Sequence, residues 1–243
     1  MRRAVALARM LVAFLCCAAP AAAEVAPADY NAFWLWGGVT PPPALAPVLA
    51  KAEALYILQG EVRLDRQRKM AELRAQGMSV PRLKNDAVWL VYRTDTLHWP
   101  ARIAALMNAR VARWRAAGNQ VIGVQIDFDS ATGRLADYAG FLRQLRGQLR
   151  PDCRLGITGL LDWSGRIDPT TMNDLAETID ELVIQTYQGR KTIAGYAAYL
   201  PHLERLTLPF KIGLVEAGDW TAPADLAANA WFRGYVVFLT NRQ

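Results

Sequence analysis

The chain has 243 residues, of which 53% are hydrophobic and 21% are charged, and its formal net charge is +6. This length is enough for one sizeable folded domain. The positive balance is mild and spread along the chain, so it gives little support to nucleic acid as a partner.

The first residues predict a secretory signal peptide. Arg2 and Arg3 supply a charged start, residues 4–19 are apolar apart from Arg9, and small residues at 21–23 form a cleavage site before Glu24. This order is typical of signal peptides, and the apolar run is too short and too interrupted for a good membrane span. We expect residues 1–23 to be removed, which leaves residues 24–243 as an exported protein, periplasmic or secreted.

The cysteines leave one alternative open for the mature chain. Cys16 and Cys17 allow a lipoprotein, although Phe14 and Leu15 before them fit a lipid-attachment box poorly. Only Cys153 follows the leader, so no disulfide can form within the mature chain. No later segment has a long uncharged apolar run, so we expect no transmembrane span there.

Strands and helices alternate along the rest of the chain. Helical periodicity is clearest in residues 99–117, 135–149, 172–178, 195–206 and 222–231, and residues 61–82 are charge-rich and predict a solvated helix plus loop. The predicted strands are residues 33–37, 55–59, 88–92, 121–127, 154–160, 181–187, 210–215 and 235–239.

Eight strand–helix repeats predict one α/β domain, a closed (β/α)₈ TIM-type barrel over residues 24–243. No glycine-rich phosphate loop follows any strand, which argues against a nucleotide fold.

The fourth predicted strand is the most informative part of the chain. Because side chains alternate along a strand, Ile126 and Phe128 point to one face while Gln125, Asp127 and Asp129 point to the other. The Cα atoms of the two aspartates are then about 6.6–6.8 Å apart. Two acids on one face of a buried strand indicate an active site. The alternative is that both cap the following helix or form ion pairs, for example with Arg134.

The carboxyl ends of barrel strands deliver the active-site side chains. Acids, amides and aromatic rings gather there, and this mixture suits a sugar, because rings stack on pyranose faces while carboxylates and amides bind hydroxyls. The residues delivered are Trp36, Gln59, Glu61, Tyr92, Arg93, Asp127, Asp129, Asp162, Trp163, Gln185, Tyr187, Gln188, Glu216, Trp220, Thr240 and Asn241.

The sequence predicts neither a metal nor another cofactor. His98 and His202 lie away from the strand ends, and no Ser-His or Cys-His pair indicates nucleophilic catalysis. A calcium or magnesium site made of Asp127, Asp129 and Asp162 remains open. Trp36 and Trp163 can bind or pack, whereas we expect packing from Trp34, Trp89, Trp99, Trp114 and Trp231.

Four segments carry a resemblance to a known family. Residues 123–129, 156–163, 185–190 and 212–216 resemble a bacterial domain-of-unknown-function family, number 3142, over nearly the whole mature chain. That family is similar to the chitinase-like glycoside hydrolases of family 18. Those enzymes carry D-G-x-D-x-D-x-E on strand four of a (β/α)₈ barrel.

The chitinase pattern falls on Ile122 to Asp129 with several departures. Gly123 and Asp127 match, Ile122 and Gln125 replace the first two aspartates, and Asp129 stands where the catalytic glutamate would be. The resemblance implies that Asp127 orients the acid and the substrate's acetamide.

Two departures fall outside strand four. Tyr187 resembles the tyrosine that supports the acetamide, but Gln188 replaces the aspartate that usually follows it. Phe238 and Leu239 lie where a tryptophan is usual.

The first hypothesis is an exported glycosidase-like enzyme acting on a polysaccharide or glycan. Asp129 is its expected general acid, Asp127 raises the pKa of Asp129 by like-charge proximity, and a second carboxylate comes from Asp162 or Glu216 unless the substrate assists. The expected sugar contacts are Gln125, Gln185, Gln188, Arg93, Trp163, Trp36 and Gln59.

The rival hypothesis is a carbohydrate-binding or envelope-assembly barrel without catalysis. An aspartate carboxyl reaches about 1.5 Å less than a glutamate carboxyl, and a misplacement of about 1 Å can cost on the order of 10²-fold in rate.

Overall fold

Residues 23–36, 42–77, 80–129 and 132–240 are described by the computed structural model. Most of the predicted leader, together with Gly37 of the first predicted strand and Asn241, lies outside the described residues. Within them, eight parallel strands close into a barrel in which β2 pairs with both β13 and β3. The strands are β2 (Ala32–Leu35), β3 (Ala54–Asp65), β5 (Ala87–Thr94), β6 (Val121–Asp127), β7 (Arg154–Leu160), β8 (Glu181–Gln185), β11 (Phe210–Val215) and β13 (Phe232–Phe238). The predicted barrel is confirmed.

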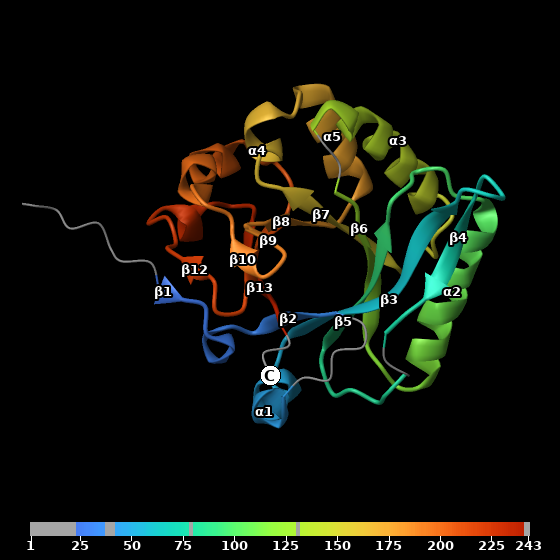
Figure 1. Ribbon diagram of the computed structural model, residues 1–243, viewed down its shortest axis with the longest axis horizontal. Helices are drawn as coiled ribbons and strands as arrows, with labels where there is room; N and C mark the ends of the chain where they lie inside the picture. Colours follow the sequence, from blue (N-terminus) through green and yellow to red (C-terminus); the bar gives the residue numbers. More distant parts are fainter. Residues whose placement is uncertain (1–22, 37–41, 78–79, 130–131, 241–243) are drawn as a thin grey trace, which may run out of the picture.

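Helices cover the outside of the strands, as Figure 1 shows for α2, α3 and α5. The α-helices are α1 (Ala46–Ala50), α2 (Ala101–Ala116), α3 (Leu135–Arg146), α4 (Trp163–Arg166) and α5 (Pro169–Thr178). The 3-10 helices are η1 (Pro27–Asp29), η2 (Pro43–Leu45), η3 (Thr132–Arg134), η4 (Tyr196–Arg205) and η5 (Leu226–Ala228).

Two predicted helices are shorter or tighter than their periodicity indicated. The helix predicted at 195–206 is the 3-10 helix η4, which contains Pro201. Proline lacks the N–H that an α-helix needs and clashes with the preceding turn. The helix predicted at 222–231 is reduced to η5.

The prediction for residues 61–82 was wrong, because β3 runs on to Asp65 and turns back into β4 (Met70–Ala75). Asp65 Oδ1 accepts hydrogen bonds from the backbone N–H groups of Gln67 and Arg68, at 2.9 and 3.1 Å. Lys69 completes the turn with a φ of 52°. A short aspartate side chain that bonds to the backbone favours a turn over a helix.

Two short ladders complete the described structure. β1 (Ala23–Glu24) pairs with β12 (Asp219–Trp220), and β9 (Tyr187–Gln188) pairs with β10 (Lys191–Thr192), both antiparallel. The second hairpin continues directly from β8 at the mouth of the barrel.

The apolar core has two layers. The outer layer lies between strands and helices, and a smaller inner layer fills the barrel. In the inner layer Trp89 lies against Gly123 and Gly156, where an added Cβ would come within 2.5 and 3.1 Å of its ring. Small residues opposite a large ring are how a narrow barrel is filled without voids.

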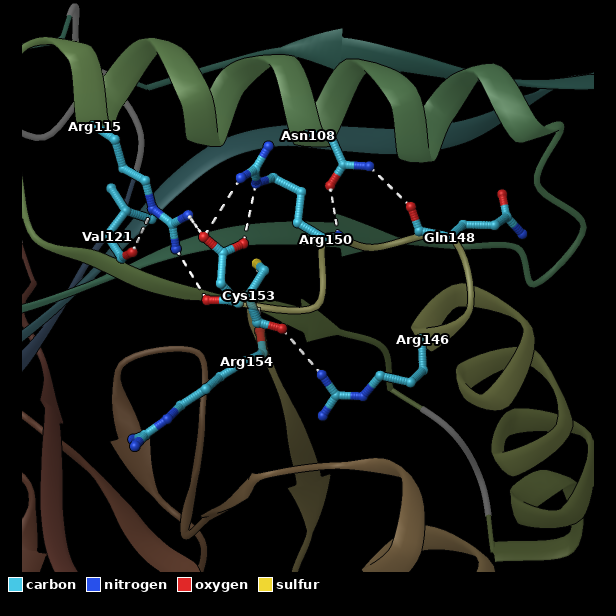
Figure 2. A network of polar contacts seen from close by, with 9 residues as sticks. Asn108, Arg115, Val121, Arg146, Gln148, Arg150, Cys153 and Arg154 are labelled. Carbon is cyan, nitrogen blue, oxygen red and sulfur yellow. Dashed lines mark hydrogen bonds and ion pairs between the residues drawn. The ribbon is translucent and has the colours of Figure 1, made fainter.

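Arginine side chains link loops and helices at the end of the barrel where the strands begin. Arg115, at the end of α2, and Arg150 both contact Asp152, at 2.7 and 3.0 Å (Figure 2). Arg146, at the end of α3, donates to the backbone carbonyl of Cys153 at 3.0 Å. These contacts hold the loop between α3 and β7, so that β7 begins at a fixed register.

Candidate active site

A cavity of about 770 Å³ opens at the carboxyl ends of the strands. This is the end at which TIM-type barrels carry their active sites. Its lining combines acids, arginines, amides and aromatic rings: Trp34, Trp36, Arg93, Asp127, Asp129, Leu160, Leu161, Asp162, Gln185, Tyr187, Gln188, Gly189, Arg190, Ile193, Tyr199, Phe238, Leu239 and Thr240.

Asp127 forms the buried acid of the cavity. It is the last residue of β6, it is 5% exposed, and its Oδ1 accepts a hydrogen bond from Thr158 Oγ1 at 2.8 Å. Burial is the largest cause that raises the pKa of Asp127 to about 6, and the charges of Asp129 and Glu61 add to it. The Thr158 hydrogen bond and Arg93 act in the opposite direction. The carboxyl therefore exchanges its proton near neutral pH.

Asp129 is the exposed acid of the pair, with 61% of its side chain accessible. Its partner is Arg93, whose Nη2 lies 3.4 Å from Asp129 Oδ2. The guanidinium of Arg93 also lies over the ring of Trp36, 5.3 Å from the centroid. Arg134, the partner considered from the sequence, instead lies over the ring of Phe128 at 5.9 Å.

Aromatic rings form one wall of the cavity. Tyr187 stacks on Phe238 at 5.4 Å, and Trp34 and Trp36 meet the same Phe238 edge-on at 5.4 and 6.1 Å. Burial, followed by the charges of Asp127 and Asp129, raises the pKa of Tyr187 well above its ordinary value, so its hydroxyl stays protonated. The wall thus offers flat apolar faces beside a fixed hydrogen-bond donor.

Most of the residues predicted for the site come together. Trp36, Arg93, Asp127, Asp129, Asp162, Gln185, Tyr187 and Gln188 all line the cavity. Gln125 lies one layer deeper, because it is two residues before Asp127 on the same face of β6 and is only 1% exposed.

Gln59 lies outside the cavity because β3 bulges. The pairing of β3 with β5 skips from Leu58 to Gly60, so Gln59 is an extra residue in the strand. It turns toward α2, where its Oε1 accepts a hydrogen bond from Trp114 Nε1 at 2.8 Å.

Trp163 and Glu216 are also absent from the lining. Trp163 is 1% exposed and packs edge-on against Tyr138 in the outer core. Glu216 Oε2 accepts hydrogen bonds from the backbone N–H and the hydroxyl of Thr240, at 2.8 and 3.1 Å. Glu216 thus secures the chain after β13.

The sequence interpretation did not select Trp34, Arg190, Tyr199 or Phe238 as binding residues, yet all four line the cavity. Trp34 could have been found, because it precedes Trp36 by two residues and so shares its face of the strand. Arg190 and Tyr199 come from the β9–β10 turn and from η4, whose positions the strand pattern does not indicate.

No group of three or more histidine, cysteine, aspartate or glutamate side chains in the described residues is placed to hold a metal ion, including the aspartates considered above. None of the described helices is both long and apolar enough to cross a membrane.

Comparison with known proteins confirms the resemblance stated from the sequence. The family described as "Domain of unknown function (DUF3142)" matches residues 93–197. The comparison with curated proteins gave no match.

Several solved structures are similar in fold at low identity. The spore cortex-lytic enzyme SleL of Bacillus cereus is 14% identical to this chain, with a TM-score of 0.47. The match covers 76% of this chain and 50% of the SleL chain, so this chain spans half of SleL. The chitinase domain of the spore coat protein CotE from Clostridium difficile is 16% identical with a TM-score of 0.43, covering 85% and 68%. The xylanase and alpha-amylase inhibitor protein XAIP-II from Scadoxus multiflorus is 14% identical with a TM-score of 0.49, covering 85% and 92%.

Proposed function

We propose that this barrel, which resembles the DUF3142 family over residues 93–197, is an exported glycoside-hydrolase-like protein that binds a polysaccharide or glycan and cleaves it with the help of an acid. The observation that carries the proposal is the pairing of two unlike carboxyls with an aromatic wall in one cavity. Rings that stack on sugar faces and acids that bind or protonate sugar oxygens are what glycosidic cleavage requires.

The two carboxyls take different roles because their surroundings differ. Asp129 is exposed to the cavity and can reach a leaving oxygen, so it is the proposed general acid. Asp127 is buried and held by Thr158, so it orients the substrate and Asp129 from below. Tyr187, Gln185 and Gln188 supply hydrogen bonds to the sugar, while Arg93 and Trp36 form the neighbouring wall.

The remaining requirement is a second carboxylate or help from the substrate. Asp162 lines the cavity, whereas Glu216 is not part of the lining and accepts a hydrogen bond from the backbone N–H of Thr240. Asp162 is therefore the proposed partner, and a substrate-assisted route is the alternative.

The test is the substitution Asp129→Asn, with Asp174→Asn as its control. Both aspartates form exposed ion pairs with an arginine, and only Asp129 lines the cavity. Soluble chito-, cello- and xylo-oligosaccharides and peptidoglycan are the probes, with new reducing ends as the product. We expect Asp129→Asn to lose on the order of 10²–10⁴-fold in kcat/KM on the probe that the wild type cleaves.

Both variants should keep their free energy of unfolding within about 0.5 kcal/mol, because exposed ion pairs contribute little. A clear loss of stability in Asp129→Asn with unchanged turnover would refute the acid role.

A non-catalytic glycan-binding protein is the second candidate, and one observation favours it. Asp129 is shorter than the glutamate of the chitinase pattern, and Arg93 already contacts its carboxylate at 3.4 Å. This candidate predicts that a probe binds without any product and that Trp36→Ala weakens binding while Asp129→Asn does not.

A further inference from the structure

A second, much smaller cavity lies inside the barrel below the mouth. Its volume is about 10 Å³, and its polar lining is Gln125, Thr158, Gln185, Tyr187 and Trp34, closed by Val183, Gly213 and Val236. Gln125 precedes Asp127 by two residues on the inner face of β6, so this cavity lies one layer beneath the buried acid.

Two hydrogen-bond donors that line this cavity have no partner among the residues that the structure describes. They are Trp34 Nε1 and Gln125 Nε2, both inaccessible to solvent. The two side chains are 5% and 1% exposed. A buried donor left without an acceptor destabilises the folded state, and native proteins rarely leave two at one place. Both therefore require an acceptor inside the cavity.

The volume decides which acceptor fits. A water molecule needs about 10–15 Å³ of probe-occupied space and two to four polar partners. The cavity has that volume and two donors, while an acetamide group is larger than the space. Thr158 adds an acceptor, because its hydroxyl proton is used on Asp127 and its lone pairs remain.

We propose that the inner cavity is a binding site for one water molecule, which accepts hydrogen bonds from Trp34 Nε1 and Gln125 Nε2 and donates one to Thr158 Oγ1. The water joins these donors to the existing hydrogen bond from Thr158 to Asp127. Consecutive hydrogen bonds polarise one another, so the chain strengthens the donation to the Asp127 carboxylate. Gln125 is then a positioning residue that acts on Asp127 through the water and Thr158.

The water site rests on burial, volume and the two donors, and it rests on the proposed function only for its relevance to cleavage. The charges of Asp129, Arg93 and Glu61 also act on the pKa of Asp127, and the charge of Asp127 in turn acts on the pKa values of Tyr138 and Tyr187. A test must therefore change the water while leaving these groups in place.

The first measurement uses the wild-type protein without a sugar. A high-resolution crystal structure should show one ordered water within hydrogen-bond distance of Trp34 Nε1, Gln125 Nε2 and Thr158 Oγ1. In solution, the Trp34 indole proton should show a cross-peak to a long-lived water. A direct bond from either donor to Gln185 or Tyr187, with no water between them, overturns the proposal.

The second measurement compares Gln125→Leu with Gln59→Leu. Both glutamines are 1% exposed, but Gln59 bonds to Trp114 outside the barrel. The midpoint of the Asp127 carboxyl titration, followed by carbon-13 NMR, should rise by about half a pH unit or more in Gln125→Leu. It should stay unchanged in Gln59→Leu, since only the first variant loses the water. Equal titrations in both variants overturn the proposal.

If Gln125→Leu does not fold, the variant Trp34→Phe removes the other donor instead. It should also raise the midpoint of the Asp127 titration, by a smaller amount. An unchanged midpoint in that variant counts against the water. Because none of these measurements uses a glycan, failure of the water site and failure of glycan cleavage are separate results.

Discussion

Asp127 and Asp129 lie two residues apart, yet one is buried and the other is open to the cavity. The difference arises because β6 ends at Asp127, which keeps that side chain inside the barrel while Asp129 lies beyond the strand. Burial, more than the neighbouring charge, raises the pKa of Asp127. The protein thus offers a proton-exchanging acid beside an accessible one.

The raised pKa of Asp127 predicts a pH dependence of stability. Its folded pKa of about 6 exceeds the ordinary aspartate value of 3.8, so the folded state holds the proton more tightly than the unfolded chain. The contribution to stability is therefore full below pH 3.8 and is lost as pH rises through about 6. A shift of roughly two pH units corresponds to about 3 kcal/mol.

Urea unfolding of the wild type and Asp127→Asn at pH 4 and pH 7.5 measures this contribution. The wild type should lose about 2 kcal/mol more than the variant over that interval, because asparagine does not titrate and the unfolded carboxyl is already partly ionised at pH 4. Equal losses in both proteins would show that Asp127 is not a buried titrating group.

At this scale the sequence predicted which residues meet but not how deeply each is buried. The alternation along β6 placed both acids on one face, and the structure agrees. The bulge between Leu58 and Gly60 turns Gln59 out of the barrel, and no residue pattern in the strand predicts such a bulge. Trp163 was placed in the outer core by α4, which begins at that residue.

At the scale of elements, β6 and β7 pack closely against the ring of Trp89, and this contact determines which residues fit in the inner layer of the core. An added Cβ on Gly123 would lie 2.5 Å from the Trp89 ring and 2.6 Å from the Arg154 carbonyl oxygen. The carbonyl belongs to the neighbouring strand and cannot rotate away. Gly123 is thus required by packing, whatever its match to the chitinase pattern.

Gly123→Ala should therefore destabilise the protein by about 1–3 kcal/mol, as overpacked cores do. Gly140→Ala is the matched control, because Gly140 lies within α3 and an added Cβ there meets nothing within 4 Å. That control should gain about 0.5–1 kcal/mol, since alanine favours a helix over glycine. Chemical denaturation measures the free energy of unfolding of both variants. An unchanged free energy in Gly123→Ala would mean that β6 and β7 can move apart.

Elements were predictable where the periodicity was strong. The strands at 121–127, 154–160 and 210–215 have the predicted bounds, because short, mostly buried apolar segments bounded by turns favour a strand. The β3–β4 hairpin was missed because its charges suit a solvated helix equally well. Its turn depends on Asp65 bonding to the backbone, which outweighs composition.

For the whole molecule, closure of the barrel depends on β13. This strand pairs with β11 on one side and β2 on the other, and its Val236 and Val237 are buried. Without it, two neighbouring strands would expose unpaired edges and the inner apolar layer.

Deleting the residues after Trp231 should abolish the cooperative thermal transition. Val237→Ala is the control within the same strand, and it should keep a cooperative transition at a lower midpoint, because it removes only part of one buried side chain. Circular dichroism melts distinguish the two. A truncated chain that still melts cooperatively would show that β2 and β11 pair without β13.

The short strand β1 bears on the order of events in the proposed export. Ala23 and Glu24 pair with Trp220 and Asp219, and Val25 is buried and exchanges backbone hydrogen bonds with residues 217 and 218. A peptidase that takes its substrate as an added strand needs this backbone free. If the leader is cut after Ala23, as the sequence predicts, cutting precedes docking and removes Ala23, so that only Glu24 and Val25 of this segment then pair with residues 217–219. On the proposal of an exported protein, a chain that folded before cutting would hide its own processing site, and slow folding would favour maturation.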